Sequence, residues 1–330
     1  MSRETLILTG AEVDRILADE ELVLSAVEEA FRMAGLGEVQ MPPKSYLTFP
    51  EHGGDLRTMP AYLPAMDAAG VKVVNSHPNN PASGWPTVMA VQTLNDPSTG
   101  FPLALMAATN LTACRTAAAG ALAAKYLSLP AASSAGFIGA GFQAGFQLRY
   151  LLRVRKIIKI LVYDVDAGRA EAFADRAKSA GVQEVRLADS SAVASADIVV
   201  LTTPGKGPVC RVGAFRAGAH INAIGADAPG KQELPAEILW HAKVVVDHRE
   251  QAAHSGEINV SVSRGHFNPS QIHAELGEIV AGKKPGRVSP GEITLFDSTG
   301  LAIQDVAVAK RVYDRAVEQH IGHAMDLGVA

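Results

Sequence analysis

The chain has 330 residues, of which 48% are hydrophobic and 19% charged, and its formal net charge at pH 7 is −4. This composition is typical of a folded globular protein of one or two domains and excludes a disordered chain. The mildly acidic balance, and a single short basic cluster at residues 153–159 that we interpret as a helix end, also exclude an electrostatic surface for nucleic acid.

Cysteine usage and hydropathy indicate the cellular environment. Cys114 and Cys210 form no CxxC pair and are too few to staple a chain of this length, so we expect both to be reduced. No stretch reaches the roughly 18 uninterrupted apolar residues of a membrane span, and the N-terminal apolar run is too short for a signal peptide. The sequence therefore predicts a cytoplasmic protein with no membrane partner.

The first 115 residues have the pattern of an antiparallel sheet preceded by helices. Two helices are expected at residues 11–17 and 21–34. Short strand patterns separated by Gly, Pro, Asn and Asp follow at 44–50, 55–63, 69–78 and 86–109. Within the last of them, "NDPSTG" between two apolar runs predicts a hairpin.

From residue 131 onward, strands and helices alternate regularly. Apolar runs predict six strands, each closely followed by helix or turn patterns, at 134–140, 159–166, 184–188, about 198–204, 218–227 and 242–249. Continuous apolar strands in this rhythm indicate βαβ units and a Rossmann-type, doubly wound parallel sheet.

The C-terminal segment suggests how the two regions are organised. Residues 305–330 read as a helix with apolar Val306, Val308, Val312 and Val317, which we expect to return to the first region. The fold class is therefore α/β, with the Rossmann-type domain (116–304) inserted in a sheet-rich α+β domain (1–115 plus 305–330).

The turn "GFIGAGFQAG" is the most informative motif. Its Gly-x-Gly-x-x-Ala pattern follows an expected strand and opens an expected helix, so backbone N–H groups and the helix dipole converge where a pyrophosphate can bind. Gly139 permits the turn, Gly141 permits close approach, and Ala144 keeps the helix near the sheet. The cofactor candidates in this turn are Gly139, Gly141, Phe142, Gln143 and Ala144.

An acid after the second strand of this region favours NAD. Asp164 stands 25 residues after Gly139, close to the ~20-residue spacing of a carboxylate that binds the ribose hydroxyls. No Arg follows it to pair with a 2′-phosphate, so NAD is favoured over NADP. Asp164 can also be a solvated loop acid, and S-adenosylmethionine-binding folds share this arrangement. Thr202, Ile224 and Gly225 are further cofactor candidates, at the ends of the fourth and fifth strands.

Isolated charges in apolar surroundings are the candidates for chemistry. Lys72 lies in the apolar strand "GVKVVN", where it is either an edge-strand lysine or a desolvated lysine suited to acid–base work. Arg57 and Arg115 are either surface charges or forks for a carboxylate or phosphate. Asp227 follows the fifth strand, where ligands bind in open α/β sheets, although an Asp before Pro-Gly is also common turn chemistry.

Other reaction classes find no support in the sequence. The histidines are scattered, so we expect no metal site. There is no GxSxG elbow or P-loop, which argues against hydrolase and P-loop chemistry. The hydroxyls of "FDSTG" either contact a nicotinamide amide or cap a turn.

These stretches together resemble the ornithine cyclodeaminase/mu-crystallin family. The matching segments are "LRTMPAYLP", "GVKVVNSHPNNP", "PTVMAVQTLNDPSTGFPLALM", "LTACRTAAAGALAAKYL", "GFIGAGFQA", "AIGADAPGKQEL" and "LFDSTGLAIQD", which cover the chain nearly end to end. Within the family, the chain looks most like the archaeal-type alanine dehydrogenase branch. The resemblance implies a homodimer that pairs through the first domain, with a nicotinamide dinucleotide on the second.

The resemblance also implies roles for single residues. Lys72 matches the family's active-site lysine, Arg57 a residue that holds the substrate carboxylate, and Asp227 the acid used on the substrate amine. Arg115 matches an arginine at the cofactor–substrate junction. Lys231 and Ser298 match positions that contact the cofactor.

The function implied is oxidative deamination of a small L-amino acid with NAD, L-alanine being favoured, with pyruvate and ammonia as products of a reversible reaction. Cyclodeamination of L-ornithine to L-proline with catalytic NAD, and imine or ketimine reduction, remain open. A non-catalytic, crystallin-like dinucleotide-binding protein is an alternative of a different class.

Overall fold

The computed structural model describes residues 4–328. The chain divides into two compact units, residues 1–115 with 301–330, and residues 116–300. The first boundary falls inside helix α3 (Thr109–Leu127), so Arg115 lies within this helix. The structural division also places residues 301–304, at the start of the C-terminal helix, with the first unit and not with the second.

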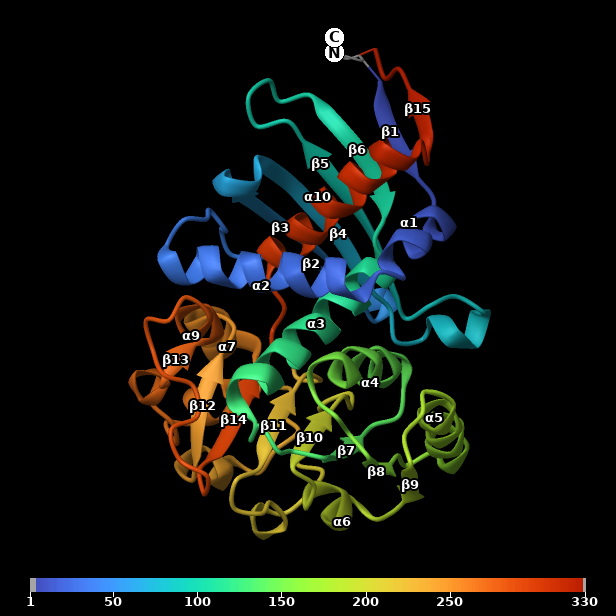
Figure 1. The fold of residues 1–330 in the computed structure, drawn as a ribbon. Helices are drawn as coiled ribbons and strands as arrows, with labels where there is room; N and C mark the ends of the chain where they lie inside the picture. Colours follow the sequence, from blue (N-terminus) through green and yellow to red (C-terminus); the bar gives the residue numbers. More distant parts are fainter. Residues whose placement is uncertain (1–3, 329–330) are drawn as a thin grey trace. The chain divides into compact units, whose positions relative to one another are not determined.

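The first unit is a seven-stranded sheet covered on one face by helices (Figure 1). The strand order is β15-β1-β6-β5-β4-β3-β2, antiparallel except for the β1–β6 pair. The strands are β1 (Thr5–Leu8), β2 (Ser45–Phe49), β3 (Gly54–Leu63), β4 (Ala68–Ser76), β5 (Val88–Asn95), β6 (Pro102–Ala107) and β15 (His323–Met325), and the helices are α1 (Gly10–Leu17), α2 (Glu20–Leu36), the start of α3, and α10 (Ala302–Gln319). The predicted antiparallel pattern and both N-terminal helices are confirmed.

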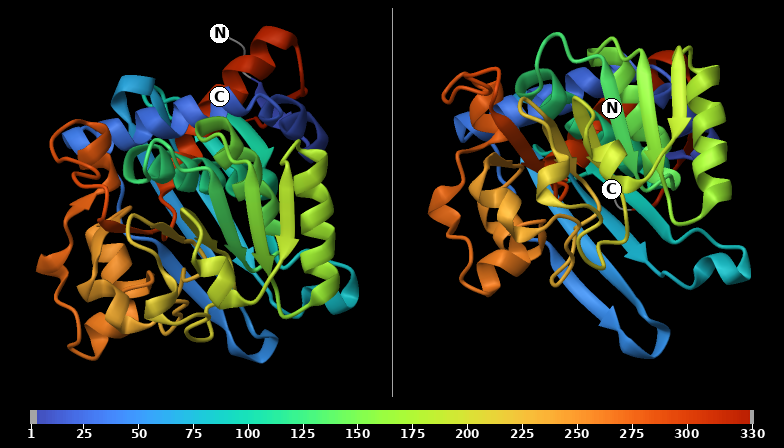
Figure 2. Two further views of the ribbon diagram at one scale, coloured as in Figure 1. Left: turned by 60° about the horizontal axis from the view of Figure 1, so that its bottom comes forward. Right: turned by 90° about the horizontal axis from the view of Figure 1, so that it is seen from below.

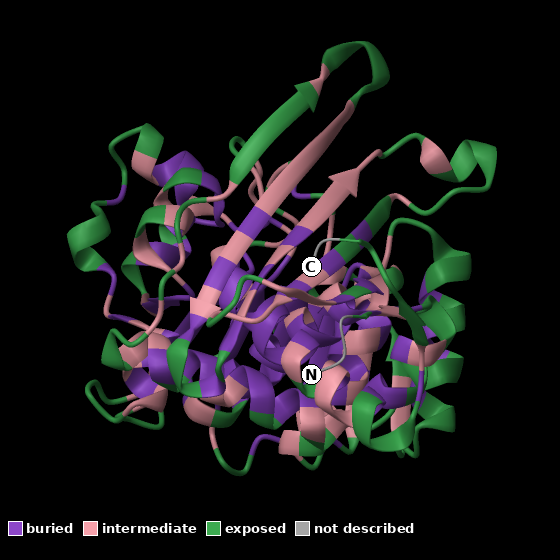
Figure 3. Ribbon diagram, turned by 90° about the horizontal axis from the view of Figure 1, so that it is seen from above, coloured by how far each residue is buried: buried purple, intermediate pink, exposed green. Residues whose placement is uncertain are grey.

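The two faces of this sheet differ strongly in burial. Alternate residues of β3, β4 and β5, such as Met59, Lys72 and Leu94, point to an inner face that is fully buried beneath α10, which also packs against α2. The intervening residues point to the outer face, where Val91 is 45% and Leu105 39% exposed. In Figure 3, strand β2 stands out as almost wholly exposed.

The C-terminal segment differs from the predicted helix. Helix α10 ends at Gln319 because His320 adopts a left-handed conformation (φ 55°), and the chain then pairs along β1 as strand β15. The apolar spacing of the valines predicted the helix, but it carried no information about the last ten residues. The short strand β1 was also missed, because only four residues pair.

The second unit is a parallel, doubly wound sheet of eight strands (Figure 2). The strand order is β13-β12-β14-β11-β10-β7-β8-β9, and every pair is parallel. The strands are β7 (Ser134–Ile138), β8 (Lys159–Tyr163), β9 (Glu184–Leu187), β10 (Ile198–Leu201), β11 (His220–Ala223), β12 (Ala242–Val246), β13 (Ala274–Glu275) and β14 (Ile293–Asp297), and the helices are α4 (Phe142–Val154), α5 (Ala167–Ser179), α6 (Ser190–Ala194), α7 (Arg249–Ser255), α8 (Asn259–Ser263) and α9 (Leu276–Val280).

The Rossmann-type fold is confirmed, although the prediction of six strands missed two. Strand β14 lies between β11 and β12 in the sheet, so it is central even though it comes near the end of the unit in sequence. Two apolar cores fill the two faces of the sheet, one around Phe137 and Phe173 and the other around Leu201 and Ile221.

The strand order has a reversal point that matters for binding. The chain runs outward from β7 through β8 to β9, and then returns to place β10 on the other side of β7. In open α/β sheets, ligands bind at the carboxyl ends of the strands at such a switch point. The turn after β7 and the loop after β10 are therefore the expected binding edge.

Candidate functional site

Lys72 lies at the centre of the buried face of the first sheet. Its side chain is completely buried, and Nζ donates to Asp305 Oδ1 of α10 at 2.7 Å. In the sheet register, Lys72 stands between Met59 of β3 and Gln92 of β5. The structure therefore excludes the edge-strand interpretation of this lysine.

Arg115 shares the same carboxylate. Its Nε donates to Asp305 Oδ1 at 2.8 Å, and another guanidinium nitrogen donates to Gln304 Oε1 at 3.1 Å. One carboxylate oxygen thus bridges two buried cations, Lys72 and Arg115. We call these three residues the Lys72–Asp305–Arg115 cluster.

Burial and charge make Lys72 titrate near neutrality. Loss of solvation, together with the nearby Arg115 charge, lowers the pKa of Lys72 to about 7, and the ion pair with Asp305 opposes this shift without cancelling it. A lysine with this pKa can donate or accept a proton at physiological pH, which suits acid–base catalysis.

Several buried polar atoms around the cluster lack partners. Within the described part of the chain, Asp305 Oδ2, Gln304 Nε2 and Gln92 Oε1 are buried and make no hydrogen bond. Unsatisfied buried polar atoms are costly, so native proteins usually keep them for a role. Donors and acceptors left open beside a titratable lysine are compatible with a polar ligand that completes them.

Arg57 lies on the same sheet face as Lys72. It stands two residues from Met59, the strand partner of Lys72, and such diagonal neighbours have Cα atoms roughly 7–8 Å apart. The guanidinium makes two 2.9 Å bonds to Asp55 and lies over the Tyr46 ring at 5.5 Å. These contacts orient the planar fork, and a bound substrate carboxylate would share it with Asp55.

Asp305, Gln304 and Gln92 were not predicted from the sequence. A signal for the first two was present, because Gln304 and Asp305 are the polar pair within 301–309, where every other residue is apolar or small and all are buried. An acid facing the core of an amphipathic helix requires a buried cation, and Lys72 and Arg115 were both available.

In the second unit, the glycine turn joins β7 to α4. Gly139 has φ +90°, and a Cβ there would lie 2.9 Å from the Thr202 backbone, so only glycine fits. A Cβ at Gly141 would meet nothing within 4 Å, which leaves the approach to the helix N-terminus open. Phe142 is 62% exposed, whereas Ala144 is fully buried against the sheet.

Asp164 braces this turn. Its Oδ2 accepts the Ala140 N–H at 2.7 Å, and its Oδ1 accepts the Asp166 N–H at 2.9 Å. Across the switch point, the Thr202 hydroxyl donates to Gly139 O at 2.8 Å. The carboxylate and the turn are therefore one hydrogen-bonded unit at the edge where an adenosine ribose would bind.

The other cofactor candidates follow β11 and β14. Ile224 is buried, and the Gly225 N–H donates to the buried Glu233. Lys231 forms an ion pair with Asp227, with Nζ and Oδ1 2.5 Å apart. Ser298 is 3% exposed, and its hydroxyl makes no hydrogen bond within residues 4–328.

Three features of the second unit match the parts of a dinucleotide. An open glycine position at a helix N-terminus, a carboxylate at the next strand end and an orphaned buried hydroxyl at Ser298 match the phosphates, a ribose and an amide, respectively. The residues present therefore fit such a group.

Two other observations concern metals and membranes. Among the described residues, no group of three or more His, Cys, Asp or Glu side chains is arranged to hold a metal ion. None of the helices between residues 4 and 328 is long and apolar enough to cross a bilayer.

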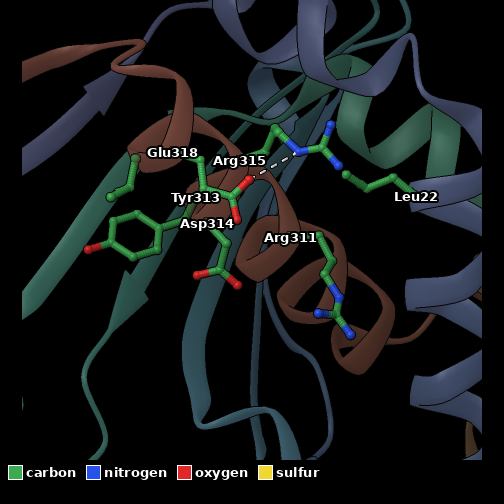
Figure 4. A pocket seen from close by; sticks show the side chains of 7 residues that line it. Leu22, Arg311, Tyr313, Asp314, Arg315 and Glu318 are labelled. Carbon is green, nitrogen blue, oxygen red and sulfur yellow. Dashed lines mark ion pairs between the residues drawn. The ribbon is translucent and has the colours of Figure 1, made fainter.

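A surface hollow of about 410 Å³ lies along the C-terminal half of α10 and is not lined by the cluster residues (Figure 4). Its charged side chains are already paired, Arg311 with Glu29 and Arg315 with Glu318. They do not converge on a common point, and we do not assign this hollow a function.

The parallel sheet with its glycine turn, together with a sheet unit that buries a lysine, defines a Rossmann-type protein with a second α+β unit. The chain belongs to the ornithine cyclodeaminase/mu-crystallin family, whose sequence model matches residues 3–320. It is 54% identical to an alanine dehydrogenase from Archaeoglobus fulgidus over 97% of each chain.

Solved structures agree with this assignment. An archaeal alanine dehydrogenase dimer with bound NAD matches with a TM-score of 0.95 and 52% identity, over 98% of this chain and 99% of the other. The Δ1-pyrroline-2-carboxylate reductase of Thermococcus litoralis, in complex with NADH and L-proline, matches with a TM-score of 0.93 and 38% identity, over 97% and 99%.

Proposed function

We propose that this protein is an NAD-dependent amino-acid dehydrogenase that converts a small L-amino acid, L-alanine being favoured, to the 2-oxo acid and ammonia in a reversible reaction. The observation that carries the proposal is the completely buried Lys72, with a pKa near 7 and unsatisfied polar atoms around it. The 54% identity to an alanine dehydrogenase supports it.

The residues of the first unit bind the substrate. Arg57 and Lys72 lie on one sheet face and present positive charge to the substrate carboxylate. Neutral Lys72 can take a proton from the amino group, and Asp305 holds Nζ in place at 2.7 Å. Arg115 donates to the same oxygen at 2.8 Å and so orients the Asp305 carboxylate.

The residues of the second unit bind the cofactor. When bound, NAD accepts the hydride from the substrate α-carbon. We assign cofactor contacts to Gly139, Gly141, Phe142, Gln143, Ala144, Asp164, Thr202, Ile224, Gly225, Lys231 and Ser298, with Arg115 from the first unit. The Asp164 carboxylate repels a 2′-phosphate, which favours NAD over NADP. Asp227, paired with Lys231, would manage the second proton while water attacks the imine.

Imine reduction and ornithine cyclodeamination are the alternative reactions, and a matching solved structure supports the first of them. The matching reductase structure holds L-proline and NADH, so imine reduction is the second candidate, and ornithine cyclodeamination the third. A non-catalytic, crystallin-like role would give no reason for a buried lysine with unsatisfied neighbours.

The test measures NADH and ammonia together. The purified protein is incubated with NAD and a panel of L-amino acids at alkaline pH, and NADH absorbance is followed while ammonia is assayed. A dehydrogenase accumulates both in equal amounts, whereas a cyclodeaminase releases ammonia without net NADH. Oxidation of NADH by cyclic imines, without activity on alanine, would favour the reductase.

We also propose that the protein is a cytoplasmic homodimer that pairs through the outer face of the first sheet. This face presents Leu47, Met89, Val91 and Leu105, each at least 36% exposed. Contiguous exposed apolar residues of this kind mark interfaces, and the matching alanine dehydrogenase structure is a dimer. The chain has only two cysteines, and a low cysteine content is usual in cytoplasmic proteins.

Charge placed on the outer face tests the dimer. We expect Val91→Glu to convert the dimer to monomers at micromolar concentration, as measured by analytical ultracentrifugation, because a buried unpaired carboxylate is costly at an apolar interface. Val165→Glu is the matched control, since Val165 is 93% exposed in the second unit. Equal masses for both variants would contradict the proposal.

A further inference from the structure

Four buried carboxylates stand behind the carboxyl edge of the second sheet. Each is at most 3% exposed: Glu233, Asp247, Glu257 and Asp297. Buried acids are rare unless they are paired, and none of the four belongs to the site residues proposed above. Their hydrogen bonds show what they hold.

Glu233 ties two loops together. Its Oε1 accepts the backbone N–H and the hydroxyl of Thr203, both at 2.7 Å. Its Oε2 accepts the backbone N–H of Gly225 at 2.7 Å. Thr203 follows β10 and Gly225 follows β11, so one carboxylate spans the ends of two adjacent strands.

The next acids hold Glu233 in turn. The Glu257 carboxylate accepts the backbone N–H groups of Glu233 and Leu234, at 2.9 and 2.7 Å. The Asp297 carboxylate accepts the backbone N–H groups of Glu257 and Ile258, at 2.9 and 3.1 Å. Each carboxylate thus anchors the backbone of the preceding acid in a relay of three.

Asp247 extends the relay to the loop after β14. It accepts the N–H groups of Thr299 and Gly300 at 2.6 and 2.7 Å, and its own N–H donates to Asp297 O at 3.1 Å. Ser298, with its orphaned hydroxyl, stands between Asp297 and Thr299. The loops after β10, β11, β12 and β14 are therefore connected through carboxylates.

The packing at Gly225 shows how closely the Glu233 carboxylate approaches the turn after β11. A Cβ on Gly225 would lie 2.6 Å from Glu233 Oε1, so the carboxylate is in direct contact with the turn. Glu233 receives three hydrogen bonds, from the Thr203 N–H, the Thr203 hydroxyl and the Gly225 N–H. A side chain whose two terminal atoms both accept can satisfy all three donors together. An amide at this position would direct its NH₂ at another donor.

We propose that Glu233 is a positioning residue, which in its ionised form accepts from the Thr203 and Gly225 turns and locks them together, and that the nicotinamide of the cofactor binds against these turns. Glu257 and Asp297 hold Glu233 for this purpose. The link to nicotinamide rests on the proposed function, whereas the lock itself does not.

The test compares Glu233→Gln with Glu237→Gln, the same chemical change at an exposed position nearby. Hydrogen exchange is measured on the ligand-free protein at the amides of Thr203, Gly225 and Ala140. Affinities for NADH and for ADP-ribose, which lacks nicotinamide, are then measured by titration.

We expect Glu233→Gln to speed exchange at Thr203 and Gly225 roughly tenfold or more, since a hydrogen bond to a charged group is lost. Ala140, which is bonded to Asp164, should be unaffected. NADH should bind roughly tenfold more weakly, with ADP-ribose unchanged. Thr203→Val removes the hydroxyl donor to Glu233, and with it the long 3.3 Å contact from the Gly205 N–H, but keeps the Thr203 N–H bond to Glu233, so it should give a smaller change of the same kind.

Three results would overturn the proposal. Unchanged exchange in Glu233→Gln removes the lock, and equal weakening of NADH and ADP-ribose removes the nicotinamide-specific role. If Glu233→Gln does not fold, Thr203→Val decides, and an unchanged NADH affinity in that variant counts against the proposal. Absence of NADH binding by the wild type would instead contradict the proposed function, and the exchange measurements would still judge the lock.

Discussion

The two units bury charge in opposite ways. In the first unit, one carboxylate, Asp305, compensates two cations, Lys72 and Arg115. In the second unit, Glu233, Glu257 and Asp297 are each held by backbone N–H groups. Compensation by side chains leaves a lysine that can exchange protons with a substrate, whereas compensation by the backbone ties loops together.

Burial shifts the pKa values of the lysine in the first unit and of the carboxylates in the second unit in opposite directions. Burial lowers the pKa of Lys72 to about 7, and burial raises the pKa of Glu233 to about 7 and of Asp297 to about 8. Three charged groups face Glu233. The Lys231 cation lowers the pKa of Glu233, whereas the Glu257 and Asp297 carboxylates carry the same charge and have pKa values that are raised in part by Glu233. Both centres therefore change charge near neutral pH.

Loss of Lys72 should have the largest effect on turnover. We expect Lys72→Ala to reduce amino-acid oxidation by about 10²–10⁴-fold, the usual contribution of a catalytic acid or base, while leaving NAD binding largely intact. Lys72→Met, which keeps the volume, separates chemistry from packing. Lys310→Ala, a lysine paired with Asp314 on α10, is the control. Unchanged turnover in both Lys72 variants would remove this residue from the mechanism.

Loss of Asp305 should have the largest effect on stability. Asp305→Asn leaves Lys72 and Arg115 buried without a counter-charge, and breaking a buried ion pair costs about 3–5 kcal/mol. The free energy of unfolding is measured in urea. Asp314→Asn on the same helix is the matched control, because Asp314 is 38% exposed and should change stability by less than about 1 kcal/mol. Similar losses in both variants would contradict a special role for the cluster.

The pH dependence of stability separates the two centres. Unfolded lysine holds its proton to about pH 10.5 and native Lys72 only to about 7, so its contribution to stability rises with pH across this window. Native Glu233 keeps its proton to about 7 and the unfolded residue only to about 4.5, so its contribution falls across that window.

Difference curves measure these slopes. The unfolding free energy of the wild type minus that of Lys72→Met should rise between pH 7 and 10. The same difference for Glu233→Gln should fall between pH 4.5 and 7. Slopes of the same sign would contradict a lowered pKa at Lys72 together with a raised pKa at Glu233.

The sequence predicted the first centre better than the second. Lys72 was recognisable because a charge inside an apolar strand has few explanations. Its partner Asp305 was not predicted, although an acid among the apolar residues of a helix was a signal for it. The carboxylate relay was not recognisable. Glu233 and Glu257 stand in segments that look like ordinary loops, and Asp297 ends strand β14, which was not predicted. The contacts from Glu257 to the Glu233 N–H and from Asp297 to the Glu257 N–H join residues 24 and 40 positions apart.

The fold shows the same division between local and distant information. The repeating strand–helix pattern predicted the Rossmann-type sheet, because each βαβ unit is local. Strand β14 was missed because its place between β11 and β12 depends on neighbours far away in sequence. The roles proposed for Arg57, Asp227 and Lys231 came from the family resemblance and not from their spacing.

Ser298 offers the smallest effect and a sharp distinction between structure and binding. Its hydroxyl is buried beside the relay but takes no part in it, because it has no hydrogen-bond partner among the described residues. Ser298→Ala therefore breaks no internal bond and should leave stability within about 0.5 kcal/mol of the wild type, or raise it slightly. NADH should bind up to about tenfold more weakly if the hydroxyl completes its bonding with the nicotinamide amide. Ser195→Ala, which loses a bond to Ala192 O on a short helix, is the control and should leave NADH affinity unchanged. A stability loss with unchanged NADH affinity would place Ser298 with the structural acids and not with the cofactor contacts.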